Sequence, residues 1–367
     1  MNVNCISADR RNDWNTFVAQ EPSFVLFQSW EWGEFKEKLG WKVFRIAVEE
    51  RGQIVAGAQL LIRPLPSRLF SMAYIPRGPI GNWLEKETAS LLFIELHRIA
   101  KLHRTIFLKI EPPISNNLVN DQILRQHGFQ RSNYTNQPRA TIVLDLKPDI
   151  DDIMEQMRDS TRRKIHSALR NGVTIRLGRS EHIPAFHQLI RMTGRREKFS
   201  TRSQTYYEQE WQTFAKNDQV ALLMAYYQEQ LLATHVAYYF GDHAAYFHGT
   251  SSYNEYTKFR PNDLLVWEAI KWAKAKGCRT YDLWGIPNEI GEVIFEGKAP
   301  PVPDRTDGLW GVYQFKRGFS KNVVSYVGTY DYVYMPQLYA LIVGKLFSAD
   351  TLDRFSAWLD KVKISFG

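Results

Sequence analysis

The chain has 367 residues, of which 44% are hydrophobic and 23% charged, so it is long enough for two globular domains and too apolar to be disordered. Its two cysteines, Cys5 and Cys278, cannot by themselves form a disulfide framework or a zinc site. The net charge of +8 is concentrated in residues 156–202, which hold twelve basic and three acidic residues. This concentration favours a polyanionic partner over a merely solvated surface, on which the two signs would be mixed.

The sequence shows no signal peptide, and no apolar run reaches the roughly 18 residues that span a membrane. It therefore predicts a cytoplasmic protein, which we expect to be a monomer. The most apolar stretch, residues 332–347, is interrupted by Pro336, Gln337 and Lys345. We interpret it as a docked C-terminal helix, with a peripheral contact at the inner face of the membrane as the alternative.

One order of elements occurs twice along the chain. Each half contains a β-hairpin, a strand with a glycine-containing break, an amphipathic helix and a strand that ends in proline. In the first half these are residues 43–62, 71–82, 88–103 and 105–113, and in the second half 220–240, 244–254, 262–277 and 279–287. This order resembles the GNAT acyltransferase fold used twice, so the sequence predicts a mixed α/β (α+β) protein with two tandem GNAT-like domains.

The loop that would identify an acyl-CoA donor is missing. GNAT enzymes hold the CoA pyrophosphate on a Q/R-x-x-G-x-G/A loop at a helix N-terminus. Between strand and helix, the first half has RGPIGN (77–82) and the second has GTSSYNEYTKFRPN (249–262). Neither fits, which disfavours a GNAT-type N-acyltransferase with an acyl-CoA or acyl-carrier donor, the alternative that we keep open.

Two motifs place a lysine among aromatic residues. In QSWEWGEFKEKLGW (28–41), helical spacing puts Trp32, Phe35 and Leu39 on a buried face and Lys36 on another. In GLWGVYQFKRGFS (308–320), the residues around Lys316 have two interpretations. One is an ordinary strand that runs into a turn, and the other is a cation placed beside an anionic group or a developing oxyanion.

With YIPRGPIG (74–81), FLKIEPP (107–113), YDLWGIP (281–287) and the duplication, these motifs resemble the FemABX family over about residues 24–345. The resemblance implies an aminoacyltransferase that moves glycine, alanine or serine from aminoacyl-tRNA to the peptide amine of a peptidoglycan precursor, in cross-bridge formation. The acceptor would be lipid II or UDP-MurNAc-pentapeptide. The resemblance also implies that residues 1–146, completed by 322–367, bind the precursor, and that 147–321 form the aminoacyl-tRNA side.

The family's functional residues map onto particular positions. Lys36, Arg202 and Tyr206 match residues that contact the precursor's diphosphate, and Tyr246 is a looser match on a strand with active-site tyrosines. Phe315 and Lys316 match the Phe-Lys pair near the transfer site. Recognition of tRNA is predicted for the basic segment, in particular for Arg158, Arg162, Arg163, Lys164, Arg195 and Arg196.

The general base is left open between Glu111, which stands where relatives have an aspartate, and the substrates' own groups. An aminoacyl ester is already activated, so we expect no metal and no other cofactor, and the histidines show no ligand or triad spacing. Residues 288–309 are predicted to form an inserted mobile loop.

A third hypothesis, a non-catalytic tRNA- or polyanion-binding protein, leaves the Phe-Lys motif unexplained. The sequence does not determine which amino acid is transferred or whether the acceptor is lipid-linked.

Overall fold

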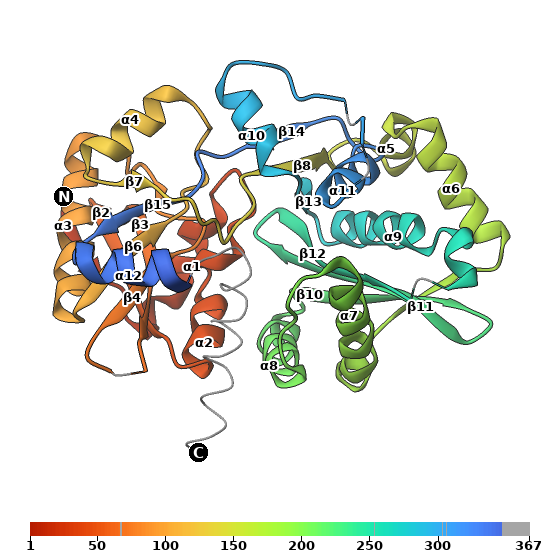
Figure 1. Cartoon of the computed structure of the whole chain (residues 1–367), viewed down its shortest axis with the longest axis horizontal. Helices are drawn as coiled ribbons and strands as arrows, with labels where there is room; N and C mark the ends of the chain where they lie inside the picture. Colours follow the sequence, from red (N-terminus) through yellow and green to blue (C-terminus); the bar gives the residue numbers. More distant parts are fainter. Residues whose placement is uncertain (67, 253, 303, 306, 347–367) are drawn as a thin grey trace. The chain divides into compact units, whose positions relative to one another are not determined.

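The computed structural model describes residues 1–66, 68–252, 254–302, 304–305 and 307–346, without the side chains of 343–346. These residues form two compact units, each with its own sheet (Figure 1). Unit 1 comprises Met1–Arg139, Gly291–Lys298 and the chain from Ser325 onward. Unit 2 comprises Ala140–Ile290 and Ala299–Val324.

The sheet of unit 1 is antiparallel except at one place. Its spatial order is β1 (Asn2–Cys5), β2 (Lys42–Glu50), β3 (Gln53–Pro64), β4 (Ser71–Ile75), β6 (Thr105–Ile110), β15 (Tyr330–Val333) and β7 (Gln130–Arg131), and β5 (Ile80–Gly81) pairs with β3. Only β4 and β6 are parallel among these pairs. The β2–β3 hairpin turns at Arg51 and Gly52, whose φ angles of 51° and 80° suit the right-handed twist of the strands.

The helices of unit 1 cover this sheet. They are α1 (Arg11–Ala19), α2 (Trp30–Lys38), α3 (Lys86–Leu102), α4 (Leu118–Gln126) and α12 (Pro336–Leu346), with the short 3-10 helices η1 (Ala8–Arg10) and η2 (Leu26–Gln28). The crossover helix α3 joins the parallel strands, and its Leu92, Phe93 and Leu96 are buried in one core with Ile46 and Leu60 of β2 and β3. The predicted docked C-terminal helix is present as α12, which packs against β6.

The sheet of unit 2 repeats this plan. Its spatial order is β14 (Val323–Ser325), β8 (Ala140–Asp145), β13 (Thr280–Gly285), β12 (His243–Ser251), β11 (Gln230–Phe240), β10 (Val220–Tyr227) and β9 (Thr174–Leu177). Here β12 and β13 are the parallel pair, joined by the crossover helix α9, which packs on β10 and β11. The hairpin β10–β11 again turns through two positive φ angles, at Gln228 and Glu229.

The remaining helices belong to unit 2, except that residues 291–295 of α10 belong to unit 1. They are α5 (Ile150–Gln156), α6 (Asp159–Arg170), α7 (Ile183–Glu197), α8 (Gln204–Phe214), α9 (Pro261–Ala275), α10 (Asn288–Phe295) and α11 (Leu309–Lys316), with η3 (Ser180–His182), η4 (Ala215–Asn217) and η5 (Glu255–Phe259). Of the two interpretations of the segment around Lys316, the strand is wrong, because these residues form the helix α11. The loop expected at 288–309 begins with a helix, α10.

Each sheet also contains a strand that the repeat did not reveal. β15 lies between β6 and β7 in the first sheet, and β8 lies between β13 and β14 in the second. Both follow in sequence the repeat of the other unit. Residues 140–146 were expected in the first domain, but β8 pairs with β13, so it belongs to the sheet of unit 2.

Candidate active site

Lys316 is the last residue of α11 and is only 6% exposed. Its Nζ donates to the carbonyl oxygens of Gly285 (2.7 Å) and Trp284 (3.1 Å). Burial lowers the pKa of Lys316 to about 7, and the negative charge of Asp282 opposes this shift. An ammonium has three donors, and two are used by described residues, so the third is available to an oxygen of a substrate.

The two carbonyls reach Lys316 because β13 bulges. The register of β13 against β8 shifts between Asp282 and Gly285, and Trp284 has a φ of 66°, which is costly for a bulky residue. Asp282 supports this conformation, since its Oδ1 accepts hydrogen bonds from the Trp284 backbone N–H (2.7 Å) and from the Thr141 hydroxyl. Strained backbone held by a buried carboxylate is typical of functional sites.

Neutral aromatic side chains lie near Lys316, beyond the two carbonyls. The ring centroid of Tyr246 lies 5.5 Å from Lys316 Nζ, so the structure places these two predicted site residues side by side. His235 stacks on Tyr246 with centroids 4.0 Å apart, and its Nε2 is 2.6 Å from the Tyr281 hydroxyl oxygen. Burial lowers the pKa of His235 to about 3 and raises that of Tyr246 to about 12, so both are neutral near pH 7. Lys316 is therefore the group of this cluster that titrates near neutrality.

The residues around Lys316 in FKRGF anchor α11. Phe315 and Phe319 pack edge to face, with centroids 5.3 Å apart. A Cβ on Gly318 would lie 2.2 Å from the Thr161 hydroxyl oxygen, so only glycine lets this turn approach α6 closely. The Gly318 carbonyl accepts the Arg158 backbone N–H at 2.9 Å.

Lys36 lies in unit 1, on the helix α2 that the first motif predicted. Its Nζ is 4.5 Å from the ring centroid of Trp32 and 4.9 Å from that of Phe35, two buried residues. The glycine between them, Gly33, faces the guanidinium of Arg45, which lies 3.5 Å from the Trp30 ring centroid. The motif thus combines one cation with the packing that holds its helix on the sheet.

Glu111, the candidate base, is surrounded by donors in unit 1. Its Oε1 accepts from the backbone N–H groups of Asn136 (2.8 Å) and Gln137 (3.0 Å) and from the Thr329 hydroxyl (2.7 Å). Its Oε2 accepts from the Tyr74 hydroxyl. A carboxylate with four donors joins distant parts of unit 1, so these contacts favour an anchoring role over proton abstraction.

Arg202 and Tyr206 lie at the start of α8 in unit 2. Ser203 caps this helix, its hydroxyl oxygen accepting the Tyr206 backbone N–H at 3.2 Å. The Arg202 guanidinium carbon is 5.6 Å from the Tyr206 ring centroid, so the predicted pair is brought together.

The residues predicted to bind tRNA lie on α6 and α7, but some of their charges are already paired. Arg162 forms an ion pair with Asp159 and also donates to the Glu155 carbonyl. Arg196 forms an ion pair with Glu197 at 2.8 Å and donates to the Ser251 carbonyl at 3.2 Å. Arg163 and Arg195 are exposed.

Sequence reasoning missed the residues that prepare Lys316. Asp282 and Trp284 stand within YDLWGIP, but nothing in the pattern reveals a bulge, and His235 lies in an ordinary, mostly apolar strand, β11. Within the described ranges, no group of three or more His, Cys, Asp or Glu residues could hold a metal ion. The described helices also include none that is both long and apolar enough to cross a bilayer.

Comparisons with known proteins show which family the chain resembles. The sequence profile described as "FemAB family" matches residues 10–228 and 223–344. The chain is 25% identical over 403 residues to the lipid II:glycine glycyltransferase of Staphylococcus aureus strain COL, covering 89% of this chain and 92% of the relative.

Two solved structures share the fold. The crystal structure of FemX superposes with a TM-score of 0.79 at 23% identity, over 93% of this chain and 100% of that chain. A tandem GNAT protein from the clavulanic acid biosynthesis pathway gives a TM-score of 0.55 at 10% identity, over 90% and 97% of the two chains. The prediction of two tandem GNAT-like domains is confirmed.

Fold and site together define a transferase built from two GNAT-like units. The chain belongs to the FemAB family, as the match over nearly its whole length shows, and it is an aminoacyltransferase of that family. The resemblance recognised from the motifs is thereby confirmed.

Proposed function

We propose that the protein transfers glycine, alanine or serine from aminoacyl-tRNA to the peptide amine of a peptidoglycan precursor, either lipid II or UDP-MurNAc-pentapeptide. The observation that carries the proposal is Lys316, a buried ammonium with one donor left for a substrate oxygen. The relative named lipid II:glycine glycyltransferase makes glycine and lipid II the first donor and acceptor to test.

The reaction exchanges an ester for an amide. The neutral acceptor amine attacks the ester carbonyl, a C–N bond forms, and the C–O bond to the ribose oxygen of the tRNA breaks. One proton leaves the amine and one reaches the ribose oxygen. In this proposal the ammonium of Lys316 stabilises the oxyanion or the leaving oxygen, and the site holds the reactants in position, which supplies about 7–11 kcal/mol of the barrier reduction in favourable cases.

The proton acceptor is not Glu111 in this scheme, because its carboxylate is occupied by four donors. The substrates' own groups serve instead. Phe315 has a supporting role, since it packs on Phe319 and holds the end of α11.

Substrate binding is assigned to the residues that match the family motifs. We predict that the precursor's diphosphate is bound by Lys36 and, separately, by the pair Arg202 and Tyr206. We predict that tRNA is bound by the basic residues of α6 and α7. If the acceptor is lipid-linked, the protein must reach the membrane surface, and we propose that α12 makes this peripheral contact. Liposome flotation tests whether the protein binds to membranes.

The test is a transfer assay with purified protein, charged tRNA and either acceptor, read by mass spectrometry. We expect a mass gain of one glycine, alanine or serine residue. A gain only from an acyl-CoA thioester would instead move the protein to the acyl-CoA class of N-acyltransferases.

Lys316→Met should lower kcat by about 100- to 1000-fold, the loss typical of a missing oxyanion donor, with little change in precursor affinity. Lys36→Met should mainly weaken precursor binding. Lys321→Met and Lys38→Met are matched controls, because both lysines are exposed and close in sequence to the residues tested. Wild-type kcat in Lys316→Met would remove the assignment.

A further inference from the structure

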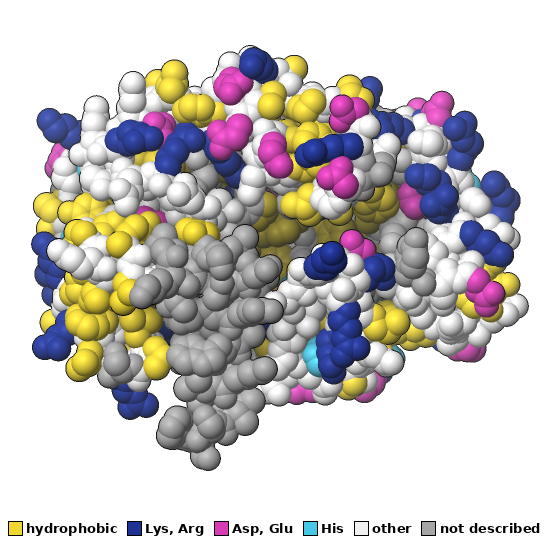
Figure 2. Space-filling model, in the orientation of Figure 1, with side chains coloured by type: hydrophobic (Ala, Val, Ile, Leu, Met, Phe, Trp, Pro, Cys, Tyr) yellow, Lys and Arg dark blue, Asp and Glu magenta, His cyan; other side chains and the backbone are white. Residues whose placement is uncertain are grey.

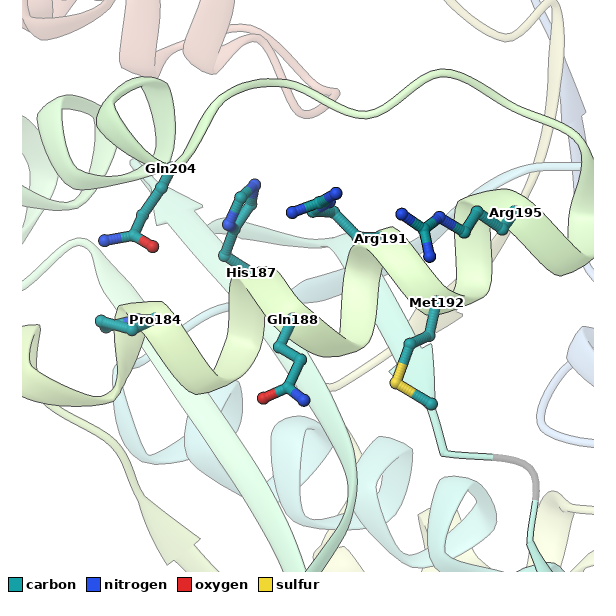
Figure 3. Close-up of a pocket in the computed structure, with 7 residues that line it drawn as sticks. All are labelled: Pro184, His187, Gln188, Arg191, Met192, Arg195 and Gln204. Carbon is teal, nitrogen blue, oxygen red and sulfur yellow. The ribbon is translucent and has the colours of Figure 1, made fainter.

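A groove lies on the surface of unit 2 between α7 and the start of α8. Its cavity volume is about 380 Å³, and its lining includes His187, Gln188, Arg191, Met192, Arg195 and Gln204. Figure 3 shows the side chains of His187, Arg191 and Arg195 in a row along one side of α7, with Gln204 facing them from α8. We call this the α7 groove.

The row follows from helical spacing. Positions 187, 191 and 195 are four residues apart, so they lie on one face with a rise of about 6 Å between neighbours. A rigid helix therefore presents three nitrogen-bearing side chains along a line of about 12 Å. Such a line fits a ligand with repeated anionic groups better than one with a single anionic centre.

No residue that the structure describes forms an ion pair with the two arginines of this row. Both of them, Arg191 and Arg195, are exposed. Other arginines of unit 2 do form ion pairs, such as Arg162 with Asp159 and Arg176 with Glu229. Like charges four residues apart destabilise a helix by about 0.2–0.5 kcal/mol, so an anionic ligand would relieve a real repulsion. Figure 2 shows Lys and Arg atoms beside a histidine over the place that α7 occupies in Figure 1.

The start of α8, at one end of the α7 groove, adds to the positive electrostatic potential of the row. Gln204 is the first residue of α8, so the positive end of that helix dipole lies at the groove. The Gln204 amide nitrogen donates to Glu208 at 2.8 Å, which fixes the side chain at the rim. His187 and Met192 add an aromatic ring and an apolar side chain, against which a base can stack.

We propose that the α7 groove binds consecutive phosphodiester groups of an RNA strand, so that His187 and Arg191, which the motifs did not single out, contact the tRNA together with Arg195. This inference rests on the proposed function, because aminoacyl-tRNA is the RNA that the reaction uses. A diphosphate has only two adjacent anionic groups and would leave part of the row without a partner.

The experiment measures binding of uncharged tRNA to the full chain over a range of salt concentrations, for Arg191→Gln, Arg195→Gln and the double variant. We expect the salt slope of log Kd to fall by about one for each arginine removed, and the double variant to bind roughly tenfold more weakly near 0.15 M salt. Arg279→Gln is the control, because this arginine is exposed in the same unit, lies outside the basic segment and is paired with Asp242, and its slope should stay unchanged.

An unchanged slope in the double variant would overturn the inference, as would a wild-type protein that binds no tRNA. Weaker binding of UDP-MurNAc-pentapeptide with normal tRNA binding would assign the groove to the precursor and also overturn it. A wrong proposed function would give a different result. The wild type would then bind tRNA with a salt slope that the groove arginines determine, but it would transfer no amino acid to either acceptor.

Discussion

At the scale of single residues, the chemistry of Lys316 is set by its neighbours. Burial turns an ordinary lysine into a group that titrates near neutral pH, while two backbone carbonyls accept hydrogen bonds from its Nζ. Asp282 acts twice, since it holds the bulge that presents those carbonyls and also favours the charged lysine. His235 and Tyr246 stay neutral and do not compete for the proton.

This environment predicts a bell-shaped pH dependence of kcat/KM. Deprotonation of the acceptor amine raises the rate with pH, and loss of the Lys316 proton lowers it above pH about 7. Removing the charge of Asp282 while keeping its acceptor oxygen, in Asp282→Asn, should move the descending limb to lower pH. Asp242→Asn, at a surface pair with Arg279, is the control. A descending limb that Asp282→Asn leaves in place would contradict the assignment.

The same depressed pKa has a consequence for stability. Between pH about 7 and 10.5 the unfolded chain keeps a proton on Lys316 that the folded state has released, so the contribution of this residue to stability rises with pH across that window. Lys316→Met removes this contribution, which chemical denaturation at pH 7 and pH 9 would measure.

At the scale of elements, α2 depends on a close approach to the sheet. A Cβ on Gly33 would lie 2.2 Å from Arg45 Nη2 and 2.5 Å from Gln59 Oε1. Neither side chain is free to move, because Arg45 donates to the Trp30 carbonyl and Gln59 donates to those of Phe27 and Ser29. The position of α2, and of Lys36 on it, follows from this contact.

Gly33→Ala should therefore displace α2, cost about 1–3 kcal/mol of unfolding free energy and weaken precursor binding. Urea unfolding and titration with UDP-MurNAc-pentapeptide measure the two effects. Gly52→Ala is the control in the same unit, because a Cβ there meets nothing within 4 Å and strains only the turn, whose φ is 80°. Equal precursor affinity in Gly33→Ala and the wild type would show that α2 does not position this binding site.

At the scale of the whole molecule, the sequence separation between paired strands is large. β15 places Tyr330 opposite Ile110 in the sheet of unit 1. The pairing includes an ion pair of 2.8 Å between Lys109 and Asp331, with side chains only 9% and 1% exposed. The sheet of unit 1 is thus complete only when β15 has returned to it.

Asp331→Ala should destabilise unit 1 by about 3–5 kcal/mol, because it leaves the Lys109 ammonium buried without its counter-charge. Hydrogen exchange should then speed up in β6, β7 and β15 and stay slow in β10, β11 and β12 of unit 2. The surface ion pair of Asp242 is the comparison, since Asp242→Ala should cost less than about 1 kcal/mol. Equal acceleration in both sheets would mean that the two units unfold together.

The sequence by itself determined the features that depend on neighbours along the chain. Apolar runs on both sides of a turn located both hairpins, helical periodicity located both crossover helices, and the order of elements, repeated twice, indicated the fold. The two lysine motifs, together with that order, were enough for the family. These features are local because the period of a strand or helix is set by the backbone.

Only the tertiary structure decided which groups meet across long distances in the sequence. It showed that β8 and β15 enter the other repeat's sheet, that Glu111 is held by Thr329 and Tyr74, and that Arg162 is paired while Arg191 is exposed. It also showed that the residues up to Lys316 form a helix, which ends against two carbonyls of a bulge. The physical reason is that burial, hydrogen bonding and ion pairing set the pKa and the role of a side chain, and these depend on the folded contacts and not on the order of residues.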